Sequence, residues 1–348
     1  MDTKAVIAEL TRIPGPSGFE QPVAARVVDL LRTYMDEAYQ DRYGNAIGIR
    51  RCGKDDAKRL LLDAHLDEVG FVVLGQKDGF LRFRSIGGVD PRVLSNQSVR
   101  ILTEPPILGL ITSLPPHLQD ATSQKDAPTF ESLWIDTGLG AEEADRRIPI
   151  GTPVVFDSSF VELQNDHWAS KALDDRAGFV ALLRAAELLQ EEPLDVDLII
   201  MGSTREEVGG SGATVGTFAL APDACIAVDV THGRTPDAPR EDAFPLGKGP
   251  AIGIGPNMNR HMTQLMMQQA EQASIPWQRE VMGGSSGTNA WHMQICREGV
   301  ATAVLSIPLK YMHTPYEVMK ATDLENTAQL IAAFVRAFSK EGGDLCKN

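Results

Sequence analysis

The sequence predicts an α/β fold: a domain with a mixed sheet and helices on both faces, interrupted by a small β-rich, barrel-like insertion. Three observations predict it. In residues 1–70, short apolar runs that suit buried strands follow an amphipathic helical pattern. In residues 71–163, short apolar runs are separated at close intervals by Gly, Pro and Asp, which is typical of an all-β module. In residues 164–348 the α/β alternation resumes, so the two outer segments are expected to form one discontinuous domain.

The first outer segment contains one predicted helix and two predicted strands. Apolar residues recur at helical spacing between residues 20 and 38, which predicts an amphipathic helix there. These residues are Val23, Val27, Leu30, Leu31 and Tyr34. Short apolar runs predict strands over residues 46–49 and 59–64, and the second run ends in a polar segment that begins at His65.

The insertion contains six predicted strands and no long helical pattern. Each strand corresponds to an apolar run of about four residues, bounded by turn-forming residues. The runs are residues 71–74, 80–83, 99–102, 108–111, 133–136 and 153–156.

The second outer segment alternates helices with apolar strands. Helical periodicity predicts helices over residues 177–190, 258–273 and 324–338. Continuous apolar runs predict buried strands over residues 197–201 and 225–228. The Pro- and Gly-rich residues 235–255 are expected to form a loop that leads into a further strand.

Composition excludes several classes of protein. Of 348 residues, 43% are hydrophobic and 23% are charged, which is ordinary for a folded chain with a sizeable core. The formal net charge of −14 makes nucleic acid and anionic membrane surfaces unfavourable partners.

The N-terminus does not resemble a signal peptide, and no run of 18 apolar residues predicts a membrane span. The widely spaced cysteines form no CxxC pair, so a reducing cytoplasm is expected. They are Cys52, Cys225, Cys296 and Cys346.

Polar residues that could bind metal follow the ends of the predicted core strands. Binding sites of open α/β sheets form at the carboxyl ends of strands, so these residues are expected to meet. They are His65 with Asp67, Asp174 with Asp175, Glu206 with Glu207, Asp229, and His313. Each has a simpler explanation by itself, such as helix capping by an aspartate pair. Together they supply nitrogen and oxygen ligands without thiolate, which suits zinc, cobalt or manganese. Two such ions roughly 4 Å apart, with a carboxylate base, would form a hydrolytic centre.

Five ordered motifs then resemble the tetrahedral (TET) aminopeptidase family, which includes glutamyl, leucyl, lysyl and deblocking aminopeptidases and some proteins labelled endoglucanases. The resemblance covers nearly the whole chain. The motifs are His65-Leu66-Asp67-Glu68-Val69-Gly70, Lys171-Ala172-Leu173-Asp174-Asp175-Arg176, Glu206-Glu207-Val208-Gly209, Asp229-Val230-Thr231 and Tyr311-Met312-His313.

The resemblance implies a metallopeptidase domain with two divalent ions, zinc or cobalt. Asp174 would bridge both ions. His65 and Asp229 would complete one site, and Glu207 and His313 would complete the other. Glu206 would be the general base, and Asp67 would orient His65. The resemblance also implies a cis peptide bond between Asp174 and Asp175.

The same resemblance implies partners. Substrates would be peptides with a free N-terminus. Residues 71–163 would be a dimerisation domain, and dimers would assemble into a homododecamer. Two departures from the family pattern, Asn289 and the turn at Gly209 and Gly210, are expected near the substrate pocket and leave specificity open.

Three other functions fit part of the pattern. A metal-dependent deacylase or carboxypeptidase would use a similar ligand set. A glycosidase would need two carboxylates about 5–10 Å apart and no metal, which leaves both histidines without a role. A catalytically silent assembly protein would be expected to have lost ligands.

Overall fold

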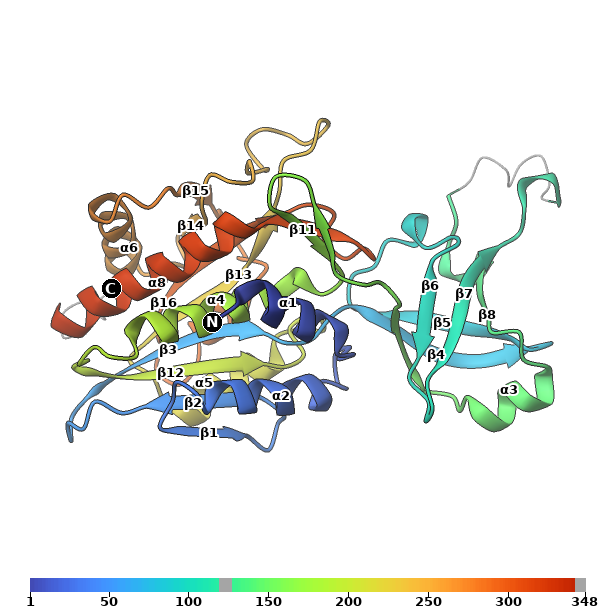
Figure 1. The fold of residues 1–348 in the computed structure, drawn as a ribbon, viewed down its shortest axis with the longest axis horizontal. Coiled ribbons are helices and arrows are strands. Elements are labelled where there is room, and N and C mark those ends of the chain that lie inside the picture. Colours follow the sequence, from blue (N-terminus) through green and yellow to red (C-terminus); the bar gives the residue numbers. More distant parts are fainter. Residues whose placement is uncertain (119–126, 342–348) are drawn as a thin grey trace.

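An eight-stranded mixed sheet forms the centre of the larger part of the computed structural model, which describes residues 1–118 and 127–341 (Figure 1). In spatial order the strands are β1 (Glu37–Gln40), β2 (Ala46–Arg50), β12 (Val196–Ser203), β3 (Lys58–His65), β13 (Ala224–His232), β16 (Ala301–Leu309), β14 (Ala251–Ile254) and β15 (Gln278–Val281). The four central strands, from β12 to β16, are parallel. Their carboxyl ends therefore share one edge, which lies towards the smaller part of the molecule (Figure 1).

Helices cover both faces of this sheet, as the sequence predicts. Leu60 and Leu62 of β3 pack into one core with α1, α2, α4, α6 and α8, whereas Leu61 packs into a second core with α5 and α7. This alternation follows from the twofold side-chain period of a strand. The helices are α1 (Thr3–Arg12), α2 (Gln21–Leu31), α4 (Leu173–Leu189), α5 (Ser211–Leu220), α6 (Arg260–Gln272), α7 (Ala290–Met293) and α8 (Ala321–Glu341).

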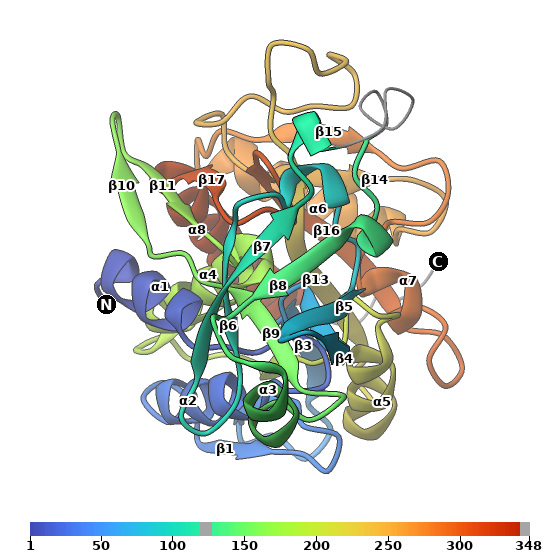
Figure 2. The same cartoon turned by 90° about the vertical axis from the view of Figure 1, so that its right-hand side faces the viewer.

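The smaller part is a closed, antiparallel, six-stranded barrel (Figure 2). In order around the barrel the strands are β4 (Gly70–Lys77), β5 (Phe80–Ile86), β8 (Leu133–Asp136), β7 (Ile107–Ser113), β6 (Ser98–Ile101) and β9 (Pro153–Phe156). All six predicted runs are confirmed as strands. Inside the barrel, the Phe71 ring packs edge-on against Phe83 and Phe156, with ring centroids 5.2 Å apart in both pairs. Among the described residues, this part also contains a short helix, α3 (Ala141–Arg147), and 3₁₀ turns at Pro91–Val93, Pro116–Leu118 and Phe130–Ser132.

A separate three-stranded antiparallel sheet lies beside the large sheet. Its strands are β10 (Val161–Leu163), β11 (His167–Ser170) and β17 (Glu317–Lys320). Ser170 at the end of β11 lies opposite Glu317 at the start of β17. The segments that continue from these two residues therefore start side by side.

The N-terminal helix prediction needs a correction. The helix predicted over 20–38 ends at Leu31, and Glu37–Gln40 form strand β1. The apolar pattern continues because Met35 is also buried, but the N–H of Asp36 donates to the Ile49 carbonyl and begins the pairing with β2. Helices α1 and α5 were not predicted, and α5 begins in a Gly-Ser-Gly segment with low helix propensity.

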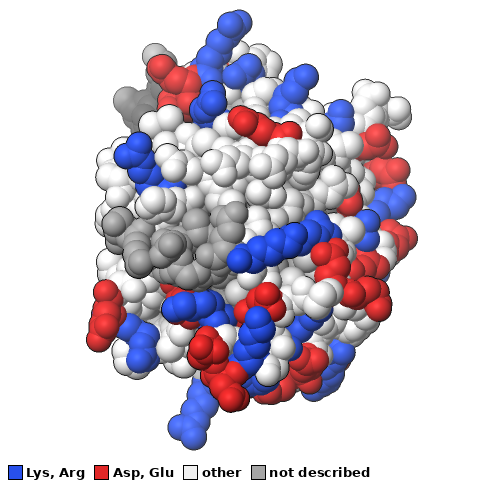
Figure 3. Space-filling view, turned by 90° about the vertical axis from the view of Figure 1, so that its left-hand side faces the viewer, with Lys and Arg blue, Asp and Glu red and all other residues white. Residues whose placement is uncertain are grey.

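Two further observations concern the surface and the cysteines. The face at the amino ends of the central strands carries charges of both signs, intermixed (Figure 3). No helix within the described ranges is long and apolar enough to cross a membrane. Cys52, Cys225 and Cys296 are free thiols, and Cys346 lies outside the described residues.

Candidate metal centre

The carboxyl edge of the central strands brings the predicted site residues together. Six of them line one cavity of about 650 Å³: His65, Asp174, Glu206, Glu207, Asp229 and His313. The seventh, Asp67, is fully buried beneath it. His65 ends β3, Asp229 lies on β13, and the two glutamates follow β12. Parallel pairing of these strands therefore explains why residues distant in sequence converge.

Asp174 lies between the two histidines. Its Oδ1 is 3.0 Å from His65 Nε2, and its Oδ2 is 3.3 Å from His313 Nε2. Asp229 Oδ1 lies 3.9 Å from His65 Nε2 on one side, and Glu207 Oε1 lies 3.1 Å from His313 Nε2 on the other. One carboxylate thus connects two histidine–carboxylate groups.

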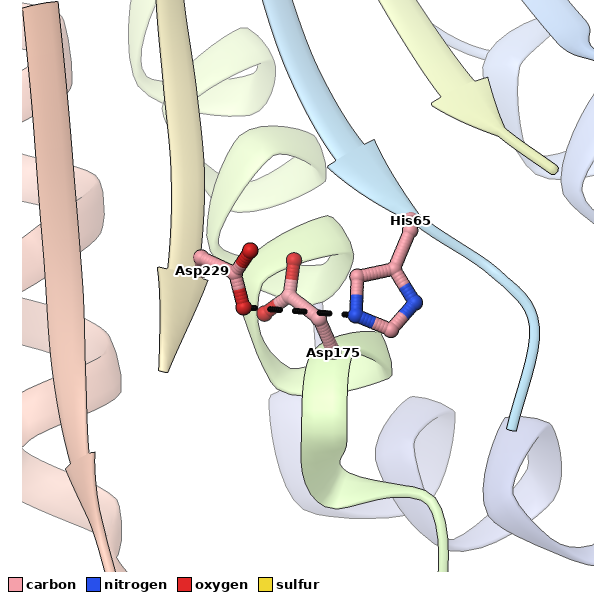
Figure 4. Close-up of side chains that lie close together, drawn as sticks. All are labelled: His65, Asp175 and Asp229. Carbon is pink, nitrogen blue, oxygen red and sulfur yellow. Dashed lines mark ion pairs between the residues drawn. The ribbon is translucent and has the colours of Figure 1, made fainter. Parts of the chain in front are cut away.

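Asp175, which the sequence places among the metal-capable residues without an assigned role, also lies in this centre (Figure 4). Ligand atoms of His65, Asp175 and Asp229 lie within 4.8 Å of one another, as do those of His65, Asp174 and Glu207. Among the described residues, Asp175 Oδ2 is buried without a hydrogen-bond partner. The peptide bond between Asp174 and Asp175 is cis, as the resemblance implies.

Crowded carboxylates make this centre suitable for cations. Burial raises the pKa values of Asp175 and Asp229 well above 3.8, and neighbouring carboxylates add to the increase. A buried carboxylate without a partner is costly when it is ionised. Bound divalent cations would remove that cost, and the oxygen and imidazole donors match zinc or cobalt.

The two neighbouring glutamates differ in their contacts. Glu207 pairs with His313, as given above, whereas the carboxylate of Glu206 makes no hydrogen bond or ion pair with any described residue. Burial, supported by the charge of Glu207, raises the pKa of Glu206 to about 8. The Glu206 carboxylate therefore faces the cavity without a partner.

Asp67 anchors the turn that carries these glutamates. Its Oδ1 accepts the backbone N–H of Glu206 at 3.0 Å, and its Oδ2 accepts the N–H of Glu207 at 3.1 Å. Ser17 donates its hydroxyl to the same Oδ2 at 2.6 Å. His65 Nδ1 lies 3.1 Å from the backbone carbonyl of Asp67 and 3.5 Å from its carboxylate. Asp67 thus contacts both halves of the centre.

Several residues around the centre escaped sequence reasoning. Glu317 is buried and accepts the backbone N–H groups of Asp174 and His313. The carbonyl oxygen of Gly88, in the loop that follows barrel strand β5, lies 2.7 Å from His313 Nδ1. The only sequence signal for Glu317 was its position four residues after His313, and Gly88 offered none.

A buried ion cluster supports the Asp174 turn from below. Arg176 is fully buried and donates to the carbonyls of Leu10, Ile13 and Leu66. Glu68 accepts from Arg176 at 3.3 Å, and it also accepts from Lys171 at 2.6 Å. These contacts hold the part of α4 that follows Asp175.

The cavity wall away from His65 and His313 carries acidic side chains together with His232. Glu241, Asp242 and Glu280 line it, and no Lys or Arg of the described residues does so. Glu280 accepts hydroxyl hydrogen bonds from Thr231 and Ser306. A cationic group would therefore be attracted to this wall.

The two departures from the family pattern adjoin the cavity without lining it, since Thr288 and Glu207 are the lining residues nearest to them in sequence. Neither Asn289 nor the turn at Gly209 and Gly210 lines the cavity. Asn289 is buried and donates to Asp63 Oδ2 and Ser203 Oγ, each at 2.9 Å. An aspartate there would face the Asp63 carboxylate, so the amide avoids a buried repulsion.

Comparisons with known proteins agree with this arrangement. Residues 44–330 match the family model described as M42 glutamyl aminopeptidase. The chain is 38% identical over 336 residues to the lysyl aminopeptidase of Pyrococcus furiosus, covering 95% of this chain and 96% of that protein. It is similar to the structure of an aminopeptidase from Desulfurococcus kamchatkensis, with a TM-score of 0.92 and 34% identity over 99% of this chain and 98% of that chain. It is also similar to the TET1 peptidase of Pyrococcus horikoshii, which can assemble into a tetrahedron or a large octahedral shell. That match has a TM-score of 0.83 and 30% identity over 96% of this chain and 99% of that chain.

Proposed function

The chain belongs to the M42 glutamyl aminopeptidase family and is a hydrolase of peptide bonds, and from this premise we propose that it is an aminopeptidase with two divalent metal ions. The observation that carries the proposal is the position of Asp174, whose two oxygens face two different histidines.

The ligands divide into two sets around Asp174. His65 and Asp229 would complete one site, and Glu207 and His313 would complete the other. The absence of thiolate from both sets favours zinc or cobalt. When bound, the two ions would supply Lewis acidity and lower the pKa of the attacking water.

Glu206 is the proposed general base. It faces the cavity without a partner, whereas Glu207 is already paired with His313. Glu206 would accept a proton from the water that attacks the first peptide carbonyl and then pass it to the leaving amine. Asp67 would hold both glutamates through their backbone N–H groups.

Substitution of the adjacent glutamates separates the base from the ligand. We expect Glu206→Gln to retain both ions and to lose about 10²- to 10⁴-fold in kcat, the range for a general base. Its matched control, Glu207→Gln, should lose one ion. Metal analysis and hydrolysis of a free aminoacyl anilide measure both effects. Normal turnover by Glu206→Gln would refute the base assignment, and two bound ions in Asp174→Ala would refute the bridging role.

Two control substrates and a chelator test the other functions. A deacylase would prefer the N-acetylated anilide to the free one, and a carboxypeptidase would cleave from the opposite end of a peptide. A metal-independent glycosidase would keep its activity after chelation, whereas an aminopeptidase with this centre would lose it.

The acidic cavity wall supports a preference for basic N-terminal side chains. Glu280 lies in the middle of the strand pair β14–β15, with Glu241 and Asp242 contributing further negative charge. The Pyrococcus furiosus relative is named a lysyl aminopeptidase. We expect a higher kcat/KM for Lys- than for Leu-anilide, and Glu280→Gln should lower the Lys value while sparing the Leu value. Equal losses for both substrates would contradict the preference.

Self-association through the barrel, in a dodecamer, is the proposed assembly. Leu108 and Leu110 lie on one face of β7 and are 61% and 55% exposed. Light scattering should give a molar mass that is a multiple of the protomer mass. The double variant Leu108→Lys, Leu110→Lys should have a lower molar mass. Ile295→Lys, at an exposed apolar position of the larger part, is the control. An unchanged mass in the double variant would contradict a role for this face.

A further inference from the structure

The turns that carry Asp174 and His313 both adjoin one end of the ladder formed by β11 and β17. In the pairing of β11 with β17, Ser170 lies opposite Glu317. Asp174 follows Ser170 by four residues, and His313 precedes Glu317 by four. The two turns thus continue from the same end of the ladder, and Glu317 lies at their common base.

Glu317 connects the backbones of both turns. Its side chain is buried, with 2% of the residue exposed. Oε2 accepts the backbone N–H of Asp174 at 3.1 Å, and Oε1 accepts the backbone N–H of His313 at 2.8 Å. One carboxylate therefore fixes how far apart the two backbones lie.

Both turns need such support because their backbones are strained. Ala172, Tyr311 and His313 have φ values of 55°, 59° and 62°, in the left-handed region that favours glycine. Non-glycine residues persist in this conformation when surrounding contacts hold them there. The hydrogen bond from the His313 N–H to Glu317 is such a contact.

Glu317 is placed to hold ligands and not to act as one. It is absent from the residues that line the 650 Å³ cavity and from both metal-capable groups. Both of its oxygens are engaged by backbone N–H groups, as given above. The ring of His313 is oriented separately, through the Gly88 carbonyl.

We propose that Glu317 is the positioning residue that sets the separation of Asp174 from His313, and thereby the affinity of the metal site that these two residues share. This inference rests on the proposed function, because that function identifies the two side chains as metal ligands.

Metal titration of Glu317→Gln tests the proposal. Glutamine offers one acceptor oxygen, so one of the two N–H groups would face its NH₂ group. Loss of a residue that orients metal ligands typically weakens metal binding about 10- to 100-fold. We expect that loss at one of the two sites when Co²⁺ is titrated into the metal-free protein by calorimetry. Excess Co²⁺ should restore most of kcat.

Asp323→Asn is the matched control. Asp323 is also a buried carboxylate that accepts two backbone N–H groups, from Gly247 at 2.6 Å and Gly249 at 2.8 Å. None of these three residues lines the cavity. Asp323→Asn should lower thermal stability but leave Co²⁺ affinity at its wild-type value.

The outcomes separate the two proposals. Wild-type Co²⁺ affinity in Glu317→Gln, or an equal loss in Asp323→Asn, would overturn the positioning role while leaving the proposed function intact. Failure of the wild-type protein to bind Co²⁺ would instead overturn the proposed function. If Glu317→Gln does not fold, Glu317→Asp, which keeps two acceptor oxygens on a shorter side chain, must show weakened binding; unchanged affinity there overturns the proposal.

Discussion

Replacement of Asp67 by asparagine should lower both stability and turnover. The aspartate accepts three hydrogen bonds, from the backbone N–H groups of Glu206 and Glu207 and from the Ser17 hydroxyl. Asparagine keeps the size of the side chain but presents only one acceptor oxygen. If that oxygen faces Glu206, the NH₂ group faces the N–H of Glu207, and two donors oppose each other.

The contacts give the size of the effect. A buried donor left without an acceptor costs about 1–3 kcal/mol. The remaining bond to Glu206 loses its charge assistance, which is worth about 1 kcal/mol more. The free energy of unfolding should therefore fall by about 2–4 kcal/mol. Because the turn also carries the proposed base, a shift of about 1 Å would lower kcat by roughly 100-fold.

Chemical denaturation and anilide hydrolysis measure the two effects, and Ser17→Ala provides the control. Ser17→Ala removes one bond and leaves Asp67 able to hold both glutamate N–H groups, so it should cost about 1 kcal/mol and retain most of kcat. The reasoning would be refuted if Asp67→Asn changed stability by less than about 0.5 kcal/mol, the range of ordinary surface substitutions. It would also fail if Ser17→Ala lowered kcat as much as Asp67→Asn.

Three further predictions concern stability. Chelation should lower the melting temperature, and added zinc should restore it, because bound ions at 100 times Kd stabilise the folded state by about 2.7 kcal/mol; an unchanged melting temperature would count against a metal centre. Arg176→Met should cost about 3–5 kcal/mol in denaturation experiments, since it leaves the buried carbonyls of Leu10, Ile13 and Leu66 without this donor and Glu68 with Lys171 as its remaining charged partner; the exposed-pair control Arg26→Met should cost under about 1 kcal/mol. A hydrogen bond from Arg336 lowers the pKa of Glu192 below 4.5, so this pair should stabilise the protein above that pH and lose its effect as the pH falls through the lowered pKa. Because both side chains are over one-third exposed, the free energy of unfolding of wild type and Glu192→Gln should differ by less than about 1 kcal/mol. If that difference in free energy persisted unchanged at low pH, it would contradict the stabilising role of this pair.

Much of the fold could be predicted from local patterns. The six apolar runs of the insertion all form barrel strands, and three of the central strands of the large sheet, β3, β12 and β13, lie where continuous apolar runs predict them. An apolar pattern shows which residues of a short segment are buried. It therefore identifies a helix or strand better than it identifies the residues at which that helix or strand begins and ends. The helix that ends at Leu31 shows this limit, because Met35 is buried outside it and continues the pattern. The domain boundaries at residues 70/71 and 163/164 stay predictions.

The sequence by itself determined which residues could form a centre, because acids and histidines at the ends of apolar strands are costly unless they meet a partner. Only the tertiary structure decided how they meet: Asp174 lies between His65 and His313, Asp175 lies beside His65 and Asp229, and Glu317 holds two of the turns. It also decided that Asn289, next to the cavity-lining Thr288, donates to Asp63. The physical reason is that the contacts of Asp174 with His65, His313 and Glu317 join residues more than one hundred positions apart, and strand order and pairing, which periodicity does not encode, bring them together.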